Sequence, residues 1–158
     1  MQGEMGARHR LESTLVGVAG EYYVAAELSA HGYLASVTLR NSRGVDIIAS
    51  NSDASRSVSI QVKTSSGKDR KWLLTQKAEG FHADNHFYVF VLLRDVGSRP
   101  DFHIVPSKIV AEYVATNHRQ WLAGTKSDGS ARKDSPMRNF RDPDGQYQEA
   151  WELLNLLK

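Results

Sequence analysis

The sequence predicts a single α/β domain in which helices flank a central mixed β-sheet. Segments with helical and with strand-like hydrophobic periodicity alternate along the 158 residues, which is typical of that class. The length corresponds to one domain, and a composition of 41% hydrophobic and 24% charged residues is that of a globular protein. We therefore expect residues 1–158 to form one domain, with a loosely ordered N-terminus over residues 1–13.

The first half of the chain predicts a helix followed by three strands. Apolar residues recur at helical spacing over residues 15–31, and Gly32 then ends the helix. An irregular strand is expected over residues 33–39. Residues 45–50 and 57–63 are strand-like segments on either side of a short polar loop, so they predict a β-hairpin.

The chain beyond residue 80 predicts two more strands and a second helix. Residues 86–93 are apolar on both faces over most of their length, which indicates an interior position in the sheet. A further strand is expected over residues 102–105. The helix that follows is predicted over residues 106–117, with Ser107 as its N-cap.

The C-terminal part of the chain is less regular in pattern. Residues 124–145 are rich in Gly, Ser, Asp, Pro and Arg, and they predict a long loop. A last helix is expected over residues 147–157, where it would close the domain.

The composition excludes several kinds of site. The chain has no Cys, which rules out disulfides, Cys-ligated zinc, iron–sulfur clusters and thiol nucleophiles. No apolar run reaches the roughly 18 residues that a membrane span needs. Residues 1–14 contain no apolar segment of the kind found in signal peptides. We therefore expect a cytoplasmic protein that does not associate with membranes.

Positive charge is concentrated between residues 40 and 77. This stretch holds eight Lys and Arg residues against three Asp, although the formal charge of the whole chain is only +2. A local basic field favours a polyanionic partner such as nucleic acid, and an ordinary solvated face is the alternative. Residues 132–133 and 138–141 form a second basic segment. The candidate phosphate contacts are Arg43, Lys68, Arg70 and Lys71.

Three polar positions interrupt apolar patterns. Glu21 falls on the apolar stripe of the first helix, where a carboxylate is costly unless something satisfies it. Asp46 stands inside an apolar strand although Asp disfavours strands. Gln61 and Lys63 project together from the face opposite the apolar residues of their strand. The ordinary alternatives are a stripe-edge residue that reaches water, a cap on the preceding turn, and a half-exposed strand face.

The hairpin brings three of these side chains together. If its turn is centred on the polar loop, Asp46 lies directly across from Gln61 and Ile48 lies across from Ser59, while Lys63 follows one pleat further along. A carboxylate, an amide and an ammonium group then converge at one edge of the sheet, where the first helix can pack over them. A shift of one residue in the register would send them to opposite faces.

Three segments carry a resemblance to a known family. They are residues 17–28 (GVAGEYYVAAEL), 44–49 (GVDIIA) and 60–65 (IQVKTS). In this order they resemble the PD-(D/E)XK nuclease superfamily, which includes restriction-endonuclease-like, Holliday-junction-resolvase-like and tRNA-endonuclease-like domains. The resemblance covers about residues 15–66. Val45 stands where Pro is common, and Gln61 replaces the usual acid, as in a minority branch that includes some homing endonucleases.

The resemblance implies a restriction-endonuclease-like core and a metal-dependent endonuclease that hydrolyses nucleic acid, most simply DNA. Asp46 would be the main ligand of Mg²⁺, for which Mn²⁺ can substitute. Gln61, through its amide oxygen, and the Val62 carbonyl would complete the protein ligands, with Glu21 binding directly or through water. Lys63 would orient or activate the attacking water. Because relatives that cut two strands often act as dimers, a homodimer through residues 81–93 or the C-terminal helix is also implied.

Two other functions remain open. Gln61 removes one negative charge from the metal site, so the chain could be a catalytically inactive member of the fold that binds nucleic acid or a protein partner. The three motifs could also coincide by chance in an unrelated α/β protein. Trp72 could stack on an exposed base, although a Trp beside two leucines is usually buried.

Overall fold

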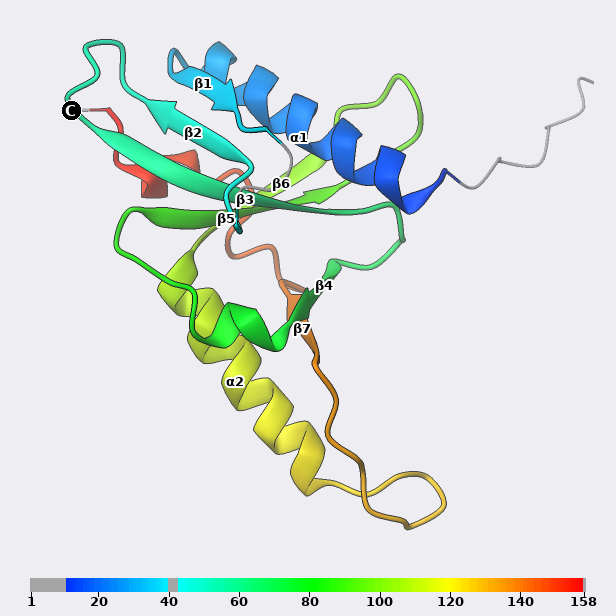
Figure 1. The fold of residues 1–158 in the computed structure, drawn as a ribbon. Helices are drawn as coiled ribbons and strands as arrows, with labels where there is room; N and C mark the ends of the chain where they lie inside the picture. The colour runs from blue at the N-terminus through cyan, green and yellow to red at the C-terminus, as the bar shows by residue number, and fades with distance from the viewer. Residues whose placement is uncertain (1–10, 40–42, 158) are drawn as a thin grey trace, which may run out of the picture.

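A five-stranded mixed sheet forms the centre of the computed structural model, which describes residues 11–39 and 43–157. The strand order is β1-β2-β3-β5-β6; β3 and β5 are parallel, and the other neighbours are antiparallel. Helix α1 covers one face of the sheet and helix α2 the other (Figure 1). The predicted α/β class is confirmed. The bounds are α1 Ser13–Ala30, β1 Leu34–Val37, β2 Ile47–Ser50, β3 Ser57–Ser65, β5 His86–Leu92, β6 Asp101–Pro106 and α2 Ser107–Ala123.

Helix α1 presents a narrow buried stripe to the sheet. The buried residues recur every fourth position because side chains four apart share one face of a helix. They are Val16, Gly20, Val24 and Leu28. The helix ends at Ala30, and Gly32, the predicted stop, follows with a φ of +86° in the left-handed region. The Tyr33 N–H then donates to the Leu28 carbonyl at 3.0 Å.

The sheet separates two hydrophobic cores, and β5 contributes to both. All of its residues are buried. Val89 and Val91 face the α1 side, whereas Tyr88 and Phe90 face the α2 side. Strand β5 is paired on both edges, so its predicted interior position is confirmed. The dimer contact predicted within residues 81–93 is wrong for the β5 part of that segment, which has no exposed surface to offer.

A second, two-stranded sheet lies beside the α2 core. It pairs β4, Lys71–Thr75, with β7, Met137–Arg141, in antiparallel register. The predicted loop over residues 124–145 is therefore wrong in its second half. Strand β7 (MRNFR) escaped prediction because its inward positions are Phe140 and the unusual buried Arg138, which pairs with Glu79.

The C-terminal helix predicted over residues 147–157 is wrong. Only a single turn of 3₁₀-helix, Trp151–Leu154, is present. The chain before it runs along the free edge of β6: the Ile104 N–H donates to the Tyr147 carbonyl at 3.0 Å, and the Glu149 N–H donates to the Phe102 carbonyl at 2.8 Å. This pairing with the sheet edge uses backbone groups that a helix would need. The dimer contact predicted for a C-terminal helix therefore has no helix to form it.

Helix α2 is longer than predicted and is not capped by Ser107. It runs to Ala123, and Pro106 is its N-cap residue. The Ser107 hydroxyl instead donates to the Ala83 carbonyl at 3.0 Å and accepts the Ala83 N–H at 3.1 Å, tying the helix to the loop before β5. Neither α1 nor α2, nor any other helix in the described ranges, has the length and apolar character needed to cross a bilayer.

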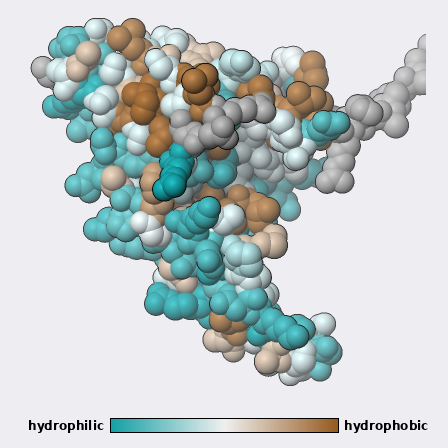
Figure 2. Space-filling view, viewed as in Figure 1, coloured by the Kyte–Doolittle hydropathy of each residue, from teal (hydrophilic) through white to brown (hydrophobic). Residues whose placement is uncertain are grey.

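Exposed apolar and polar residues are unevenly distributed. Hydrophobic residues gather over the part of the molecule that contains α1, β1 and β2, whereas the arm containing the end of α2 is mainly hydrophilic (Figure 2). Strand β1 is an edge strand and contributes several of the exposed apolar side chains. The larger members of this surface are Tyr22, Leu34, Val37 and Ile48.

Candidate active site at the start of the β2–β3 hairpin

The β2–β3 register is the predicted one along the ladder, but it changes at Asp46. Ile48 pairs with Ser59, as the predicted turn requires, and Ile47 pairs with Ile60. The Asp46 N–H also bonds to the Ile60 carbonyl, at 2.8 Å. Two residues of one strand thus face one residue of the other, which is the arrangement of a β-bulge. Asp46 is therefore not the direct ladder partner of Gln61, and that detail of the prediction is wrong.

The bulge nevertheless brings the Asp46 carboxylate against β3. Its Oδ2 atom accepts the backbone N–H of Val62 at 2.7 Å. Val62 is the residue between Gln61 and Lys63, so the carboxylate lies beside the middle of that tripeptide. The described residues give the second carboxylate oxygen no hydrogen bond.

Gln61 and Lys63 lie on the α2-facing side of β3. Their register partners on β5 are Tyr88 and Phe90, which belong to the α2 core. Both side chains are half-buried, and in residues 11–39 and 43–157 no hydrogen bond or ion pair occupies either one. An amide and an ammonium group therefore stand available two residues apart on the strand that holds the Asp46 carboxylate.

Two titratable side chains lie near enough to Asp46 to be influenced by its charge. Burial raises the pKa of Tyr88 to about 12, and the negative charge of Asp46 adds to this increase. Burial also lowers the pKa of His86, although the contact with Ser59 and the charge of Asp46 oppose the shift. Tyr88 thus stays protonated and His86 neutral at pH 7. The negative charge of Asp46 thus acts on both side chains.

Helix α1 packs on the face of β3 opposite Gln61 and Lys63, so the prediction that this helix packs over their side chains is wrong. A Cβ atom added at Gly20 would lie 1.8 Å from the Thr64 Oγ1 atom, so the helix backbone contacts β3 directly at this point. Thr64 follows Lys63 and Glu21 follows Gly20. Glu21 and Lys63 are therefore each one residue from the crossing of the two elements. Glu21 is half-buried at the border of the stripe rather than within it.

The available donors suit a hard cation better than a zinc ion. The described residues contain no group of three or more His, Cys, Asp and Glu side chains placed to hold a metal. The donors near Asp46 are the carboxylate, the Gln61 amide oxygen and the Val62 carbonyl. All are oxygens, as Mg²⁺ prefers, and Mg²⁺ commonly relies on one or two carboxylates together with water and substrate phosphate.

The predicted phosphate contacts divide into two kinds. Lys68 and Lys71 are exposed and, with Arg94 and Arg141, line a groove of about 700 Å³. Arg70 lines the same groove, but its guanidinium is engaged within the protein: it donates to the Pro143 carbonyl at 3.1 Å and to the Gln148 side chain at 2.9 Å.

The structure also places Arg43, a predicted phosphate contact, and Trp72, the candidate for stacking on a base. Arg43 is exposed in the turn before Asp46. Trp72 is buried, and its indole N–H donates to the Val91 carbonyl at 2.8 Å. It is therefore a core residue, and the base-stacking alternative is excluded.

Arg141 is a candidate contact that the basic stretch of residues 40–77 does not contain. It lies directly opposite Lys71 in the β4–β7 pairing. The second basic segment of the sequence thus joins the first on one surface. The signal that could have found this is the alternation of residues 137–141, in which every second residue faces outward.

Comparison with solved structures supports the fold. The chain is similar to a bacterial homing endonuclease, I-Ssp6803I, with a TM-score of 0.53 and 16% identity over 92% of each chain. Hjc, a Holliday junction resolvase from the archaeal hyperthermophile Archaeoglobus fulgidus, has a TM-score of 0.49 and 14% identity over 90% of this chain and 98% of its own. No protein-family model and no curated protein sequence matches the chain. The chain has the restriction-endonuclease-like fold.

Proposed function

We propose that this protein is a metal-dependent endonuclease that hydrolyses phosphodiester bonds, with DNA as its substrate. The observation that carries the proposal is the Asp46 carboxylate, held by the Val62 N–H between Gln61 and Lys63. Side chains of these types at the start of a hairpin in this fold are the nuclease arrangement that the sequence resembles. The likeness in structure to a homing endonuclease supports the fold on which the proposal depends.

Each residue has a separate part in the proposed reaction. Asp46, Gln61 and the Val62 carbonyl would hold Mg²⁺ or Mn²⁺, with Glu21 binding directly or through water. The cation would polarise the phosphoryl oxygen and make a bound water more acidic. Lys63 would orient the attacking water and offset the charge that develops on the phosphate. The hydrogen bond from Val62 fixes the carboxylate in advance, so less ordering is required when substrate binds.

A catalytically inactive module that binds nucleic acid or a protein partner is the second candidate. The observation that favours it is Gln61, because an amide in place of a carboxylate leaves the site with less negative charge to attract a cation. Binding of nucleic acid requires the same basic surface near Lys68 and Lys71 in either candidate. Only the first requires the metal.

Cleavage assays distinguish the two candidates. The wild-type protein is incubated with supercoiled, linear, branched and single-stranded DNA and with RNA, in Mg²⁺, in Mn²⁺ and in chelator. We expect cleavage of at least one DNA form in Mg²⁺ or Mn²⁺ and none in chelator. Absence of cleavage with every substrate and both metals would reject the nuclease and leave the binding module. Cleavage that persists in chelator would reject the proposed requirement for a divalent metal.

A further inference from the structure

The β4–β7 ribbon has an outward face built from three cross-strand pairs. Because strand side chains alternate between faces, every second residue of each strand points away from the core. The inward pairs are Trp72 with Phe140 and Leu74 with Arg138, all buried. The outward pairs are Lys71 with Arg141, Leu73 with Asn139, and Thr75 with Met137.

The outward face carries an arrangement that protein stability does not explain. Like charges directly opposite each other destabilise an antiparallel pair, yet Lys71 faces Arg141. In the described part of the chain, neither cation has a carboxylate partner. Leu73 and Met137 are also 57% and 54% exposed, on either side of the half-buried Asn139. The two unneutralised cations indicate a polyanionic partner. The amide and the exposed apolar side chains beside it are further groups that such a partner can contact.

The inner face of the ribbon makes this surface rigid. The Trp72 indole N–H is bonded to the Val91 carbonyl, and the Phe140 ring stacks on Phe90 with centroids 4.5 Å apart. Arg138 pairs with Glu79 and also donates to the Ser135 carbonyl at 2.6 Å. The outward side chains are thus presented from a fixed backbone, which reduces the ordering needed when a partner binds.

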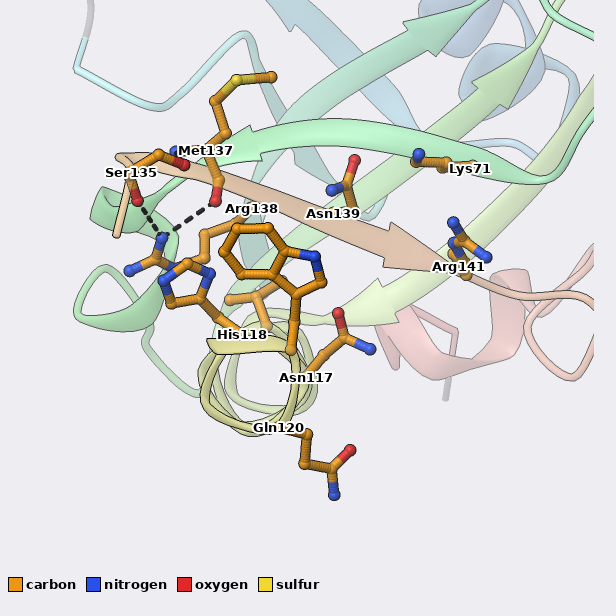
Figure 3. Close-up of a pocket in the computed structure, with 11 residues that line it drawn as sticks. Lys71, Asn117, His118, Gln120, Ser135, Met137, Arg138, Asn139 and Arg141 are labelled. Carbon is orange, nitrogen blue, oxygen red and sulfur yellow. Dashed lines mark hydrogen bonds between the residues drawn. The ribbon is translucent and has the colours of Figure 1, made fainter. Parts of the chain in front are cut away.

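Helix α2 forms a wall beside the ribbon. A hollow of about 630 Å³ lies between the last turns of α2 and β7. Figure 3 shows Asn139, Lys71 and Arg141 on the ribbon side of this hollow and Asn117 and Gln120 on the helix side. The helix therefore adds amide groups to the amide and cations of the ribbon.

From this combination we infer that the outward face of the β4–β7 ribbon reads base pairs in the major groove of duplex DNA. The major groove of B-DNA is about 12 Å wide and admits a two-stranded β-ribbon. Asn139 has the donor and acceptor to pair with adenine, the exposed Leu73 and Met137 suit the thymine methyl group, and Lys71 and Arg141 suit guanine or phosphate. The major groove of an RNA duplex is too narrow and deep for such contacts.

The ribbon is also close to the proposed active site along the chain, and this part of the inference rests on the proposed function. Strand β4 follows β3 after residues 66–70, and Lys71 is eight residues from Lys63. An extended chain spans at most about 3.6 Å per residue, which limits the separation to roughly 29 Å. With base pairs stacked about 3.4 Å apart, the base contacted by Lys71 would lie within roughly eight base pairs of the bond cleaved.

Binding without cleavage tests the inference. Wild-type protein in chelator is equilibrated with a library of randomised duplex DNA, and the selected sequence is then compared among variants. The ribbon variants are Asn139→Ala and the double variant Lys71→Ala with Arg141→Ala. Asn85→Ala and Lys108→Ala are the controls, because they remove an exposed amide and an exposed cation away from the ribbon. Circular dichroism and thermal melting confirm that each variant is folded.

We expect the wild type to select a sequence and Asn139→Ala to lose about tenfold discrimination at one position. The double variant should bind all sequences more weakly, with a salt dependence smaller by about two phosphate contacts. Replacing purines by their 7-deaza analogues in the selected site should weaken wild-type binding, and an RNA duplex of the same sequence should compete poorly. Both control variants should resemble the wild type.

The outcomes separate this inference from the proposed function. Absence of wild-type binding to duplex DNA, equal competition by RNA, or unchanged selectivity and salt dependence in the ribbon variants would overturn the inference, whether or not the protein cleaves DNA. Ribbon-dependent selection by a protein that cleaves nothing in any metal would uphold the inference and reject the nuclease.

Discussion

Replacing Asp46 by Asn is expected to abolish cleavage and leave the protein folded. A unit charge about 4 Å from a divalent ion contributes about 8 kcal/mol at the effective dielectric constant near a protein surface, twice the value for two unit charges, and its loss corresponds to at least a thousandfold in rate. The Asn side-chain oxygen can still accept the Val62 N–H that Oδ2 accepts now. The free energy of unfolding should therefore change little while the rate falls below detection.

The Asp46→Ala variant separates the two roles of this side chain. It removes the acceptor as well as the charge, so the Val62 N–H loses its partner. We expect the free energy of unfolding to fall by about 1–3 kcal/mol in urea titrations, with cleavage lost as in Asp46→Asn. Asp53→Asn, in the exposed hairpin turn, is the matched control and should cleave normally. An Asp46→Asn protein that cleaves at the wild-type rate would remove Asp46 from the site.

Alanine substitutions at two glycines of α1 are expected to have opposite effects on the stability of the protein. Gly20→Ala would place a methyl group 1.8 Å from the Thr64 hydroxyl oxygen, whereas nothing lies within 4 Å of a Cβ at Gly17. Overpacking of this kind costs about 1–3 kcal/mol, and relief of the clash would displace the helix that carries Glu21. Gly17→Ala should instead stabilise the helix by about 0.5–1 kcal/mol. We expect Gly20→Ala to lose stability and cleavage together and Gly17→Ala to retain both.

A second substitution tests the cause of the Gly20→Ala effect. Thr64→Ala removes Oγ1, the atom closest to the added methyl group, but leaves the Thr64 Cβ position at 2.9 Å. The double variant should therefore recover part of the stability in thermal melting experiments. If the double variant recovers no stability, or if Gly17→Ala and Gly20→Ala lose stability equally, the close packing of α1 on β3 is contradicted.

The elements with regular hydrophobic periodicity were predictable, and they are the ones that frame the site. Helix α1, with its Gly32 stop, and strand β5 follow directly from spacing. The pairing of Ile48 with Ser59 follows from the position of the polar loop. These features depend on local pattern, so one sequence is sufficient to predict them.

Features that depend on tertiary partners were not predictable. Strand β7 buries Arg138 because Glu79 is there to pair with it, and no local pattern indicates that partner. Residues 147–149 pair with β6 instead of forming a helix because the edge of that strand is free. The bulge at Asp46 inserts one residue without changing the hydrophobic alternation. The sequence therefore predicted the register of the hairpin but not how the Asp46 carboxylate reaches β3.

If Asp46 and its neighbours on β3 bind a divalent cation, calorimetric titration of Mn²⁺ into the protein should detect the binding. The titration compares the wild type with Gln61→Glu and Asp46→Asn. A carboxylate at position 61 adds a charge at short range from the divalent ion, worth about 2–8 kcal/mol. We expect binding by the wild type, at least about tenfold tighter binding by Gln61→Glu, and none by Asp46→Asn. No measurable binding by either the wild type or Gln61→Glu would contradict this expectation.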